Sequence, residues 1–279
     1  MPSMSSPPSA SSPAAPGGHF PNHRRIFLET SAVVVASLVL LIPYYHLPLS
    51  EADEGIIATG AERILRGQIP YRDFFSELGP ASFYLQAVIF KLGAINVTAL
   101  RLTAWLLGGA ISGLIYLLAR KVMGGFRASF AASIFLLICY PSAYRVSHHW
   151  WANLFLMLTV LSLDASFPPA PGASNSRRRG WLLLAGFLAA TTLLSMQSKG
   201  FWAIVMGSAF LIIEPYLSES ENRGEHLKLG LRQAAWFLTG SAATIATVAG
   251  YFAFHGALGA WVDDNVVFLF TNYRTYLDV

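Results

Sequence analysis

The chain has 279 residues, of which 54% are hydrophobic and only 12% are charged. Soluble domains carry roughly 25% charged residues, so this chain has too little charge to cover a surface that faces water on all sides. The formal net charge of +4 is small and no nucleic-acid signature accompanies it, so we expect no nucleic-acid partner. The single cysteine, Cys139, excludes a disulfide within the chain.

Residues 1–25 are predicted to form a disordered cytoplasmic tail, because residues 1–22 are rich in Ser, Pro, Ala and Gly and hold almost no large apolar side chains. An apolar run from Ile26 to Leu47 follows and has about the length of a membrane-spanning helix. A secretory signal peptide is the alternative interpretation. The run is long for such a peptide and no A-x-A cleavage site follows it, so the first helix is predicted to be retained.

Residues 26–279 are predicted to form one all-α transmembrane domain with about seven spans. The candidate spans after the first are 98–120, 127–145, 149–167, 180–198, 200–217 and 232–254. The first outer loop, 48–97, contains the only long polar stretch, 48–78, and a short apolar segment, 79–94. That segment is too short to span a bilayer comfortably and is predicted to be interfacial or re-entrant.

The basic residues predict the orientation of the chain in the membrane. With the N-terminus inside, the inner loops hold the densest groups of Arg and Lys, above all the triplet Arg177, Arg178 and Arg179. Short loops rich in Lys and Arg stay on the cytoplasmic side. The inverted topology would expose this triplet outside, so we expect a cytoplasmic N-terminus and a first loop on the outer side.

The polar part of the first outer loop is predicted to begin with an amphipathic helix that lies in the membrane interface. Ser50 could cap this helix and Gly67 ends it. Asp53 and Glu54 fall in the first turn, away from the apolar face. That face comprises Ile56, Ile57, Ala61, Ile64 and Leu65.

Two interpretations of Asp53 and Glu54 remain open on spacing alone. Acidic residues in a first turn complement the helix dipole, and this is the commoner case. Alternatively, a carboxylate that faces a cleft accepts a proton from a hydroxyl group. Asp73 and Glu77 add two more carboxylates to the loop, near a turn at Gly79-Pro80. The acids, arginines and aromatic residues of this loop fit either a site for a charged, sugar-like substrate or an ordinary solvated loop.

A longer pattern combines these features. It reads Asp53-Glu54-Gly55, a short helix, Gly67-x-x-Pro70-Tyr71-x-Asp73-Phe74, then Gly79-Pro80 and an aromatic helix. This pattern resembles the first outer loop of the GT-C membrane glycosyltransferases, in the bacterial branch related to protein O-mannosyltransferases (family 39) and described as RgtA/B/C/D-like. The resemblance covers about residues 30–279, and its specific part is 53–84. Relatives continue beyond the position of Val279, so the chain is expected to be their N-terminal part.

The resemblance implies an enzyme that moves a hexosyl or pentosyl group from a polyprenyl-phosphate carrier to an envelope lipid, glycan or protein acceptor. It implies a multi-pass protein of the bacterial inner membrane with its active site on the periplasmic side. Asp53 matches the position of the catalytic base and Glu54 stands beside it. Asp73 and Glu77 are expected to position the acceptor. No cofactor is expected, and no spacing supports a divalent metal.

The sequence also departs from this family pattern. Many relatives carry a Lys-Pro pair where this chain has Leu78-Gly79-Pro80, so a phosphate-binding lysine is missing there. Lys199, which lies between two apolar runs on the outer side, is a candidate to replace the missing lysine as a phosphate contact. Alternatively, Lys199 is a lysine at a helix end whose side chain only extends to water. Arg63 and Arg72 are weaker phosphate candidates, and Arg63 could instead pair within its helix.

The sequence His148-His149-Trp150-Trp151 opens the fourth span on the outer side. Adjacent residues point about 100° apart on a helix, so the two histidines are poor joint metal ligands. His148 is retained as a candidate substrate contact, and the tryptophans fit an interfacial aromatic belt.

Two other classes of function remain as alternatives. A transporter or flippase for lipid-linked sugars would be expected to show paired repeats, and none is visible. A non-catalytic, decayed transferase is the other alternative. Formation of a new glycosidic bond separates the enzyme from both.

Overall fold

The computed structural model describes residues 23–47, 52–142, 144–167, 175–217 and 223–271. Within these ranges the regular elements are helices, and the pairing of Pro70 with Phe74 is an isolated bridge. Residues 1–22 of the predicted disordered tail, 1–25, and the predicted cap residue Ser50 lie outside the described residues, whereas residues 23–25 are helical and begin α1. The all-α fold class predicted from the sequence is confirmed.

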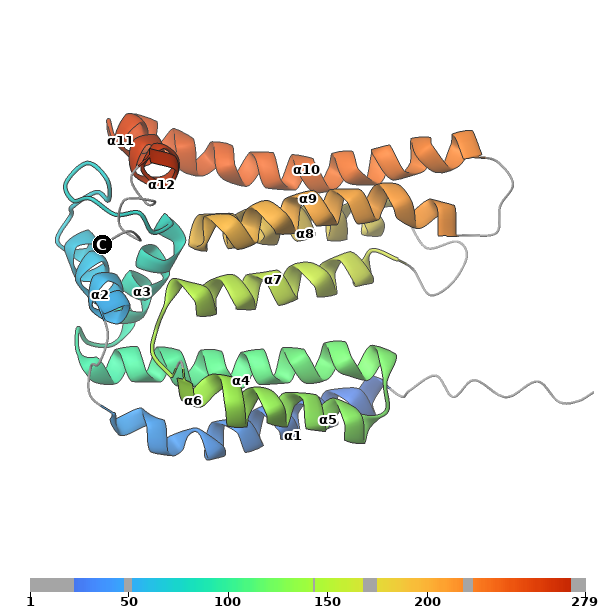
Figure 1. Ribbon diagram of the computed structural model, residues 1–279, viewed down its shortest axis with the longest axis horizontal. Coiled ribbons are helices and arrows are strands. Elements are labelled where there is room, and N and C mark those ends of the chain that lie inside the picture. Colours follow the sequence, from blue (N-terminus) through green and yellow to red (C-terminus); the bar gives the residue numbers. More distant parts are fainter. Residues whose placement is uncertain (1–22, 48–51, 143, 168–174, 218–222, 272–279) are drawn as a thin grey trace, which may run out of the picture.

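The long helices lie roughly side by side along the long axis of the molecule (Figure 1). Their bounds are α1 (His23–Leu40), α4 (Val97–Val122), α5 (Gly125–Ile134), α7 (His148–Ala165), α8 (Asn175–Ser195), α9 (Gln197–Ile213) and α10 (Arg223–Phe254). Short segments extend three of them: η1 (Ile42–His46) follows α1, η2 (Phe135–Cys139) and α6 (Tyr140–Ser142) follow α5, and η3 (Glu214–Leu217) follows α9. Each predicted span coincides with one of these helices.

Three helices of the described part are long and apolar enough to cross a membrane by length and composition: Val97–Val122, Gln197–Leu217 and Gly224–Phe254. The surface of α9 carries large apolar side chains, with Phe201, Trp202 and Met206 between 54% and 62% exposed. A contiguous apolar surface of this kind is stable against lipid and not against water. The chain is therefore an integral, polytopic membrane protein.

The shorter helices gather at one end of the bundle, which we call the capped end (Figure 1). They are α2 (Ala52–Leu65), α3 (Pro80–Leu92), α11 (Leu258–Val262), η4 (Asp263–Val267) and α12 (Phe268–Thr271). The two helices expected in the first outer loop, α2 and α3, are therefore present. Gly67 ends α2 as predicted, with a positive φ of 84° that glycine adopts without strain.

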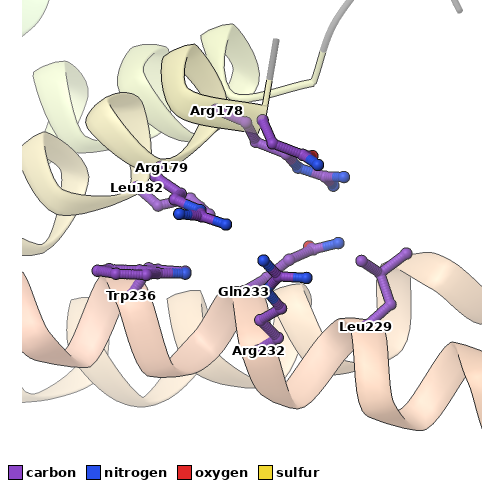
Figure 2. A pocket seen from close by; sticks show the side chains of 8 residues that line it. Arg178, Arg179, Leu182, Leu229, Arg232, Gln233 and Trp236 are labelled. Carbon is purple, nitrogen blue, oxygen red and sulfur yellow. The ribbon is translucent and has the colours of Figure 1, made fainter. Parts of the chain in front are cut away.

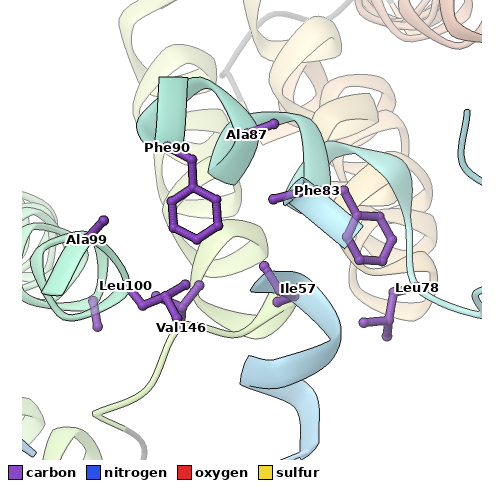
Figure 3. Close-up of a cluster of buried hydrophobic side chains, with 10 residues drawn as sticks. Ile57, Leu78, Phe83, Ala87, Phe90, Ala99, Leu100 and Val146 are labelled. Carbon is purple, nitrogen blue, oxygen red and sulfur yellow. The ribbon is translucent and has the colours of Figure 1, made fainter. Parts of the chain in front are cut away.

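The buried face of α2 differs from the predicted one. Ile57 and Ala61 are fully buried against α3 and α4, in the cluster drawn in Figure 3. Ile56 and Leu65 are exposed, and Glu54 is buried on the same side as Ile57. Positions three and four residues apart share a helical face, so 54, 57 and 61 form the inward stripe. The prediction that Glu54 lies away from the buried face was wrong for this reason.

Two long helices, α8 and α10, approach each other backbone to backbone. A Cβ atom on Gly186 would lie 1.9 Å from the carbonyl oxygen of Phe237, so only glycine fits there. The Ser241 hydroxyl donates to the Gly186 carbonyl at 3.0 Å. Small residues allow helices in membranes to pack closely in this way.

Candidate active site

The first turn of α2 brings Asp53 to the capped end of the bundle, where it is half-buried. Its carboxylate is close enough to His148 and His149, the first residues of α7, to interact electrostatically with both rings. The ammonium group of Lys199, near the start of α9, acts on the same two rings. The fold thus brings together candidates that lie far apart in the sequence: Asp53, His148 and Lys199.

The two histidine rings do not point apart as expected. Their centroids are 4.2 Å apart with 35° between the ring planes. The Nδ1 atom of His148 and the Nε1 atom of Trp151 are buried without a hydrogen-bond partner in the described part of the chain. Both atoms are therefore unused polar groups in the first turn of α7, of a kind that substrate can satisfy.

The predicted aromatic belt was also wrong. Trp150 and Trp151 are buried in a cluster that includes Phe135 and Tyr140, with the Trp150 ring 5.6 Å from Phe135. The reason is that α7 runs between α4 on one side and α8 and α9 on the other, so neighbouring helices cover its first turn (Figure 1).

Lys199 reaches across from α9 to α7. Its Nζ atom donates to the Asn153 Oδ1 atom at 2.7 Å, and it makes no salt bridge within the described residues. Asn153 follows His149 by four residues, one helical turn, so both share one face of α7. Sequence reasoning missed Asn153, although this spacing from the histidines would have been a signal.

The carboxylate of Glu54 is fully buried and both of its oxygens are engaged. Arg101 of α4 donates to each oxygen, at 2.9 Å for Oε2, and the Val146 amide donates to Oε1 at 3.3 Å. The Arg101 Nε atom donates to the Leu47 carbonyl at 2.7 Å. This buried ion pair joins α2, α4, the residue that follows η1 and the segment before α7, and it fixes the turn that carries Asp53.

Asp73 and Arg72 pair with each other in the loop after α2, and Arg63 of α2 donates to the same loop. Asp73 accepts hydrogen bonds from the Ile69 amide at 2.7 Å and from Arg72 at 2.9 Å. Arg63 donates to the Asp73 carbonyl at 2.9 Å and to Gln68 at 2.6 Å, rather than pairing within its helix. The hydrogen bonds from Arg72 and Ile69 lower the pKa of Asp73 to about 2.

We expect Asp73→Ala to loosen this loop without changing the bundle. The pKa of Asp73 is lower in the folded protein, so its stabilising effect is fully present above the unfolded pKa and is lost only as the pH falls toward about 2. Limited proteolysis of the loop should therefore give equal rates at about pH 8 and about pH 5 for the wild type. The variant should be cleaved faster at both pH values. Equal cleavage of the variant and the wild type would contradict this role.

Glu77 belongs to a second polar group, which joins the loop to η4. The Ser76 amide donates to the Asp264 carboxylate at 3.2 Å. The Gln197 amide donates to the Glu77 carbonyl and to the Asn265 Oδ1 atom, both at 2.8 Å. Burial raises the pKa of Asp264, and the negative charges of Asp263 and Glu77 raise it further. Sequence reasoning missed Gln197 and Asn265, which carry no charge and lie 68 residues apart.

The turn before α3 requires glycine at position 79 and holds Tyr71 in an unusual backbone conformation. A Cβ atom on Gly79 would lie 2.1 Å from the Leu194 carbonyl oxygen at the end of α8. Tyr71 adopts a φ of 70°, which is strained for a residue with a side chain. Its hydroxyl donates to the Leu78 carbonyl at 2.8 Å and its amide donates to the Phe74 carbonyl at 2.8 Å. These bonds hold the loop in one conformation.

An apolar cavity opens beside this turn, between the start of α3, the α8–α9 junction, α10 and η4. Its free space, the open mouth included, is about 1250 Å³. Polar atoms come from Gln197, Ser198 and Asn265, and most of the lining is apolar, including Phe201, Trp202, Ile245, Trp261, Leu269 and Phe270. Within the described ranges, no three His, Cys, Asp or Glu residues cluster in a way that could hold a metal ion.

No protein-family model and no curated protein sequence matches the chain. One solved structure resembles it: ArnT from Cupriavidus metallidurans in the apo state, with a TM-score of 0.55 and 20% sequence identity. The match covers 82% of this chain and 42% of the ArnT chain, so the chain spans less than half the length of that protein. At this identity the likeness concerns the fold alone, and the chain has a fold similar to that of the matched part of the ArnT chain.

Proposed function

We propose that this protein is a membrane glycosyltransferase that moves a sugar from a polyprenyl-phosphate carrier to a hydroxyl group of a lipid, glycan or protein acceptor. The observation that carries the proposal is the meeting of Asp53, His148, His149 and Lys199 at the capped end of a bundle whose fold resembles that of ArnT. A carboxylate, two imidazoles and an ammonium group provide a base and a cation within one site.

In the proposed reaction, Asp53 accepts the proton of the acceptor hydroxyl while the hydroxyl oxygen attacks the anomeric carbon. The bond between that carbon and the phosphate oxygen breaks, and the electron pair leaves with polyprenyl phosphate. Phosphate is a good leaving group, so one base and a cation suffice, whereas glycoside hydrolysis needs two carboxylates. Lys199 would bind the phosphate charge. Glu54 would only position the turn that carries Asp53, because Arg101 and Val146 already occupy its carboxylate oxygens.

The apolar cavity supports a lipid-linked donor. Ser198 and Gln197 line it, and Lys199 is the next residue along α9. A polyprenyl chain buries methyl and methylene groups favourably against such a lining. A lipid tail held there would bring its phosphate to the end of the bundle where Lys199 lies. A soluble nucleotide-sugar would gain nothing from this cavity.

The orientation belongs to the same proposal. The triplet Arg177–Arg179 opens α8 at the end of the bundle opposite Asp53 (Figure 1). If that triplet is cytoplasmic, Asp53 faces the outer, periplasmic side of a bacterial inner membrane and the N-terminus is cytoplasmic. A hexosyl or pentosyl group would then be transferred at the outer membrane surface.

A transfer assay tests the proposed function. The full-length gene product in membranes is supplied with radiolabelled polyprenyl-phosphate hexoses and pentoses. A labelled product with a new glycosidic bond is the expected result. Movement of the intact donor across the bilayer, with no new bond, would support a flippase instead. Failure with every donor would support a decayed, non-catalytic transferase.

We expect Lys199→Met to weaken donor binding more than it slows the bound complex. A hydrogen bond to a charged group contributes about 1.5–3 kcal/mol, so KM for the donor should rise about 10- to 100-fold. Lys91→Met is the matched control, because Lys91 is an exposed lysine of α3 at the same end of the bundle. Steady-state kinetics on both variants separate KM from kcat. An unchanged KM in Lys199→Met would remove Lys199 from the donor site.

A further inference from the structure

A second polar pocket lies at the opposite end of the bundle, between the beginnings of α8 and α10 (Figure 2). Its free space, the open mouth included, is about 310 Å³. Arg178 and Arg179 enter from α8, and Arg232 and Gln233 enter from α10 (Figure 2). The remaining lining residues are Asn175, Leu182, Leu229 and Trp236. None of these residues takes part in the chemistry proposed for Asp53.

The amide of Gln233 is the clearest sign of a missing ligand. Gln233 is 2% exposed, and neither its Nε2 nor its Oε1 atom has a hydrogen-bond partner in the described part of the chain. The buried Nε atom of Arg178 also lacks a partner there. Buried polar groups are almost always satisfied, since leaving them unpaired costs a full desolvation penalty. Figure 2 shows the Gln233 side chain extending into the space between the two helices.

The pocket has an excess of positive charge. Among the described residues, Glu214 approaches it with a carboxylate oxygen 4.0 Å from Arg178. Arg179 lies over the Trp236 ring, with 5.3 Å from its Cζ atom to the ring centroid, which orients its guanidinium beside the pocket. Arg232 makes no salt bridge within the described ranges. Three guanidinium groups around one small space favour an anion with several acceptor oxygens.

The fold explains how the space arises. The helices α8 and α10 touch backbone to backbone at Gly186, two turns beyond Arg178 and Arg179. Toward the N-terminal ends of α8 and α10, the residues between the two helices are long arginine and tryptophan side chains instead of glycine. These side chains hold the helices apart. Arg178 and Arg179 lie in the first two turns of α8, and Arg232 and Trp236 lie nine and thirteen residues after the first residue of α10. Arginine and tryptophan together are typical of the level at which lipid headgroups meet a membrane protein.

We propose that this pocket binds the phosphate of an anionic lipid headgroup that also carries a hydroxyl group. The arginines and the Gln233 Nε2 atom would donate to the phosphate oxygens, and the Gln233 Oε1 atom would accept from the headgroup hydroxyl. A glycerol phosphodiester has both functions. The site is separate from the proposed transferase site and lies at the other end of the bundle.

The test is native mass spectrometry of the full chain, freed of lipid in neutral detergent. It is titrated with dioctanoyl phosphatidylglycerol, dioctanoyl phosphatidylcholine and inorganic phosphate. We expect saturable binding of phosphatidylglycerol and much weaker binding of the other two. Each arginine near a membrane surface contributes about fivefold in affinity, so Arg178→Gln combined with Arg232→Gln should weaken binding roughly 25-fold. Equal binding of inorganic phosphate would show a free-phosphate site and overturn the lipid assignment.

Matched variants keep the result interpretable. Arg177→Gln removes the same charge from the same helix, but Arg177 is exposed and does not line the pocket. It should leave the affinity unchanged, and an equal loss would show only general attraction between charges. Gln233→Met keeps the packing volume, removes the orphaned amide and avoids the folding risk of the arginine variants. It should fold normally and lose affinity for phosphatidylglycerol, and retained affinity would overturn the proposal. These binding readouts do not depend on transferase activity.

Discussion

Replacing Asp53 by asparagine is expected to lower the rate of sugar transfer about 10²- to 10⁴-fold, the usual contribution of a general base. The substitution keeps the size of the side chain but replaces one carboxylate oxygen by an NH2 group, which cannot accept the proton. Asp53 is half-buried and makes no salt bridge within the described residues, so the fold should survive. The measurement is kcat and KM with a polyprenyl-phosphate sugar, and the loss should fall on kcat.

Glu62→Gln is the control for Asp53→Asn. It removes a carboxylate from the same helix, where Glu62 pairs with Arg66 on the surface. Transfer by this variant should equal that of the wild type. If Asp53→Asn also transferred at the wild-type rate, Asp53 would be an acid that complements the dipole of α2, and the search for the base would move to Asp73 and Glu77.

The second large effect concerns the buried pair between Glu54 and Arg101. Removing one partner leaves the other charge buried and unpaired, which costs about 3–5 kcal/mol. We therefore expect Arg101→Met and Glu54→Gln each to destabilise the folded protein strongly. The double variant Glu54→Gln with Arg101→Met removes both charges and should recover much of the lost stability. Unfolding in mixed micelles at increasing denaturant measures the free energies.

The surface pair Glu62–Arg66 provides the comparison for the buried one. Its side chains are 33% and 71% exposed, so its loss should cost less than about 1 kcal/mol. Similar costs for the two pairs would contradict the assignment of Glu54 to a structural role. A double variant as unstable as the sum of the single variants would show that the two groups do not interact.

The helices were predictable because their signal is local. Each span is a run of apolar residues long enough to cross lipid. The length and composition of such a run can be read from the segment itself, without knowing which other helices it contacts. The end of α2 was predictable for the same reason, since Gly67 marks it. The inward face of α2 was not, because both Ile56 and Ile57 are apolar and only packing against Phe83 and Leu100 decides which is buried.

The polar contacts were predictable only where they lie within one turn. Glu62–Arg66 follows from spacing, whereas Glu54–Arg101 joins residues 47 positions apart. Asn153, Gln197 and Asn265 are neutral amides whose roles arise from contacts between helices, and of the three only Asn153 is marked in the sequence, by its four-residue spacing from His149. The sequence does not predict the left-handed conformation of Tyr71 either, because tertiary hydrogen bonds impose it.

The bond from the Val146 amide to Glu54 has a consequence for how the protein is made. The two residues are 92 positions apart, so the turn that carries Asp53 leaves the ribosome long before the Val146 amide does. Arg101 can pair with Glu54 once α4 has been inserted, but the Val146 contact requires α5 to be in the bilayer as well. The hydrogen bonds that fix this turn are therefore complete only when the segment before α7 has been made, and a shorter nascent chain holds Glu54 without one of its partners.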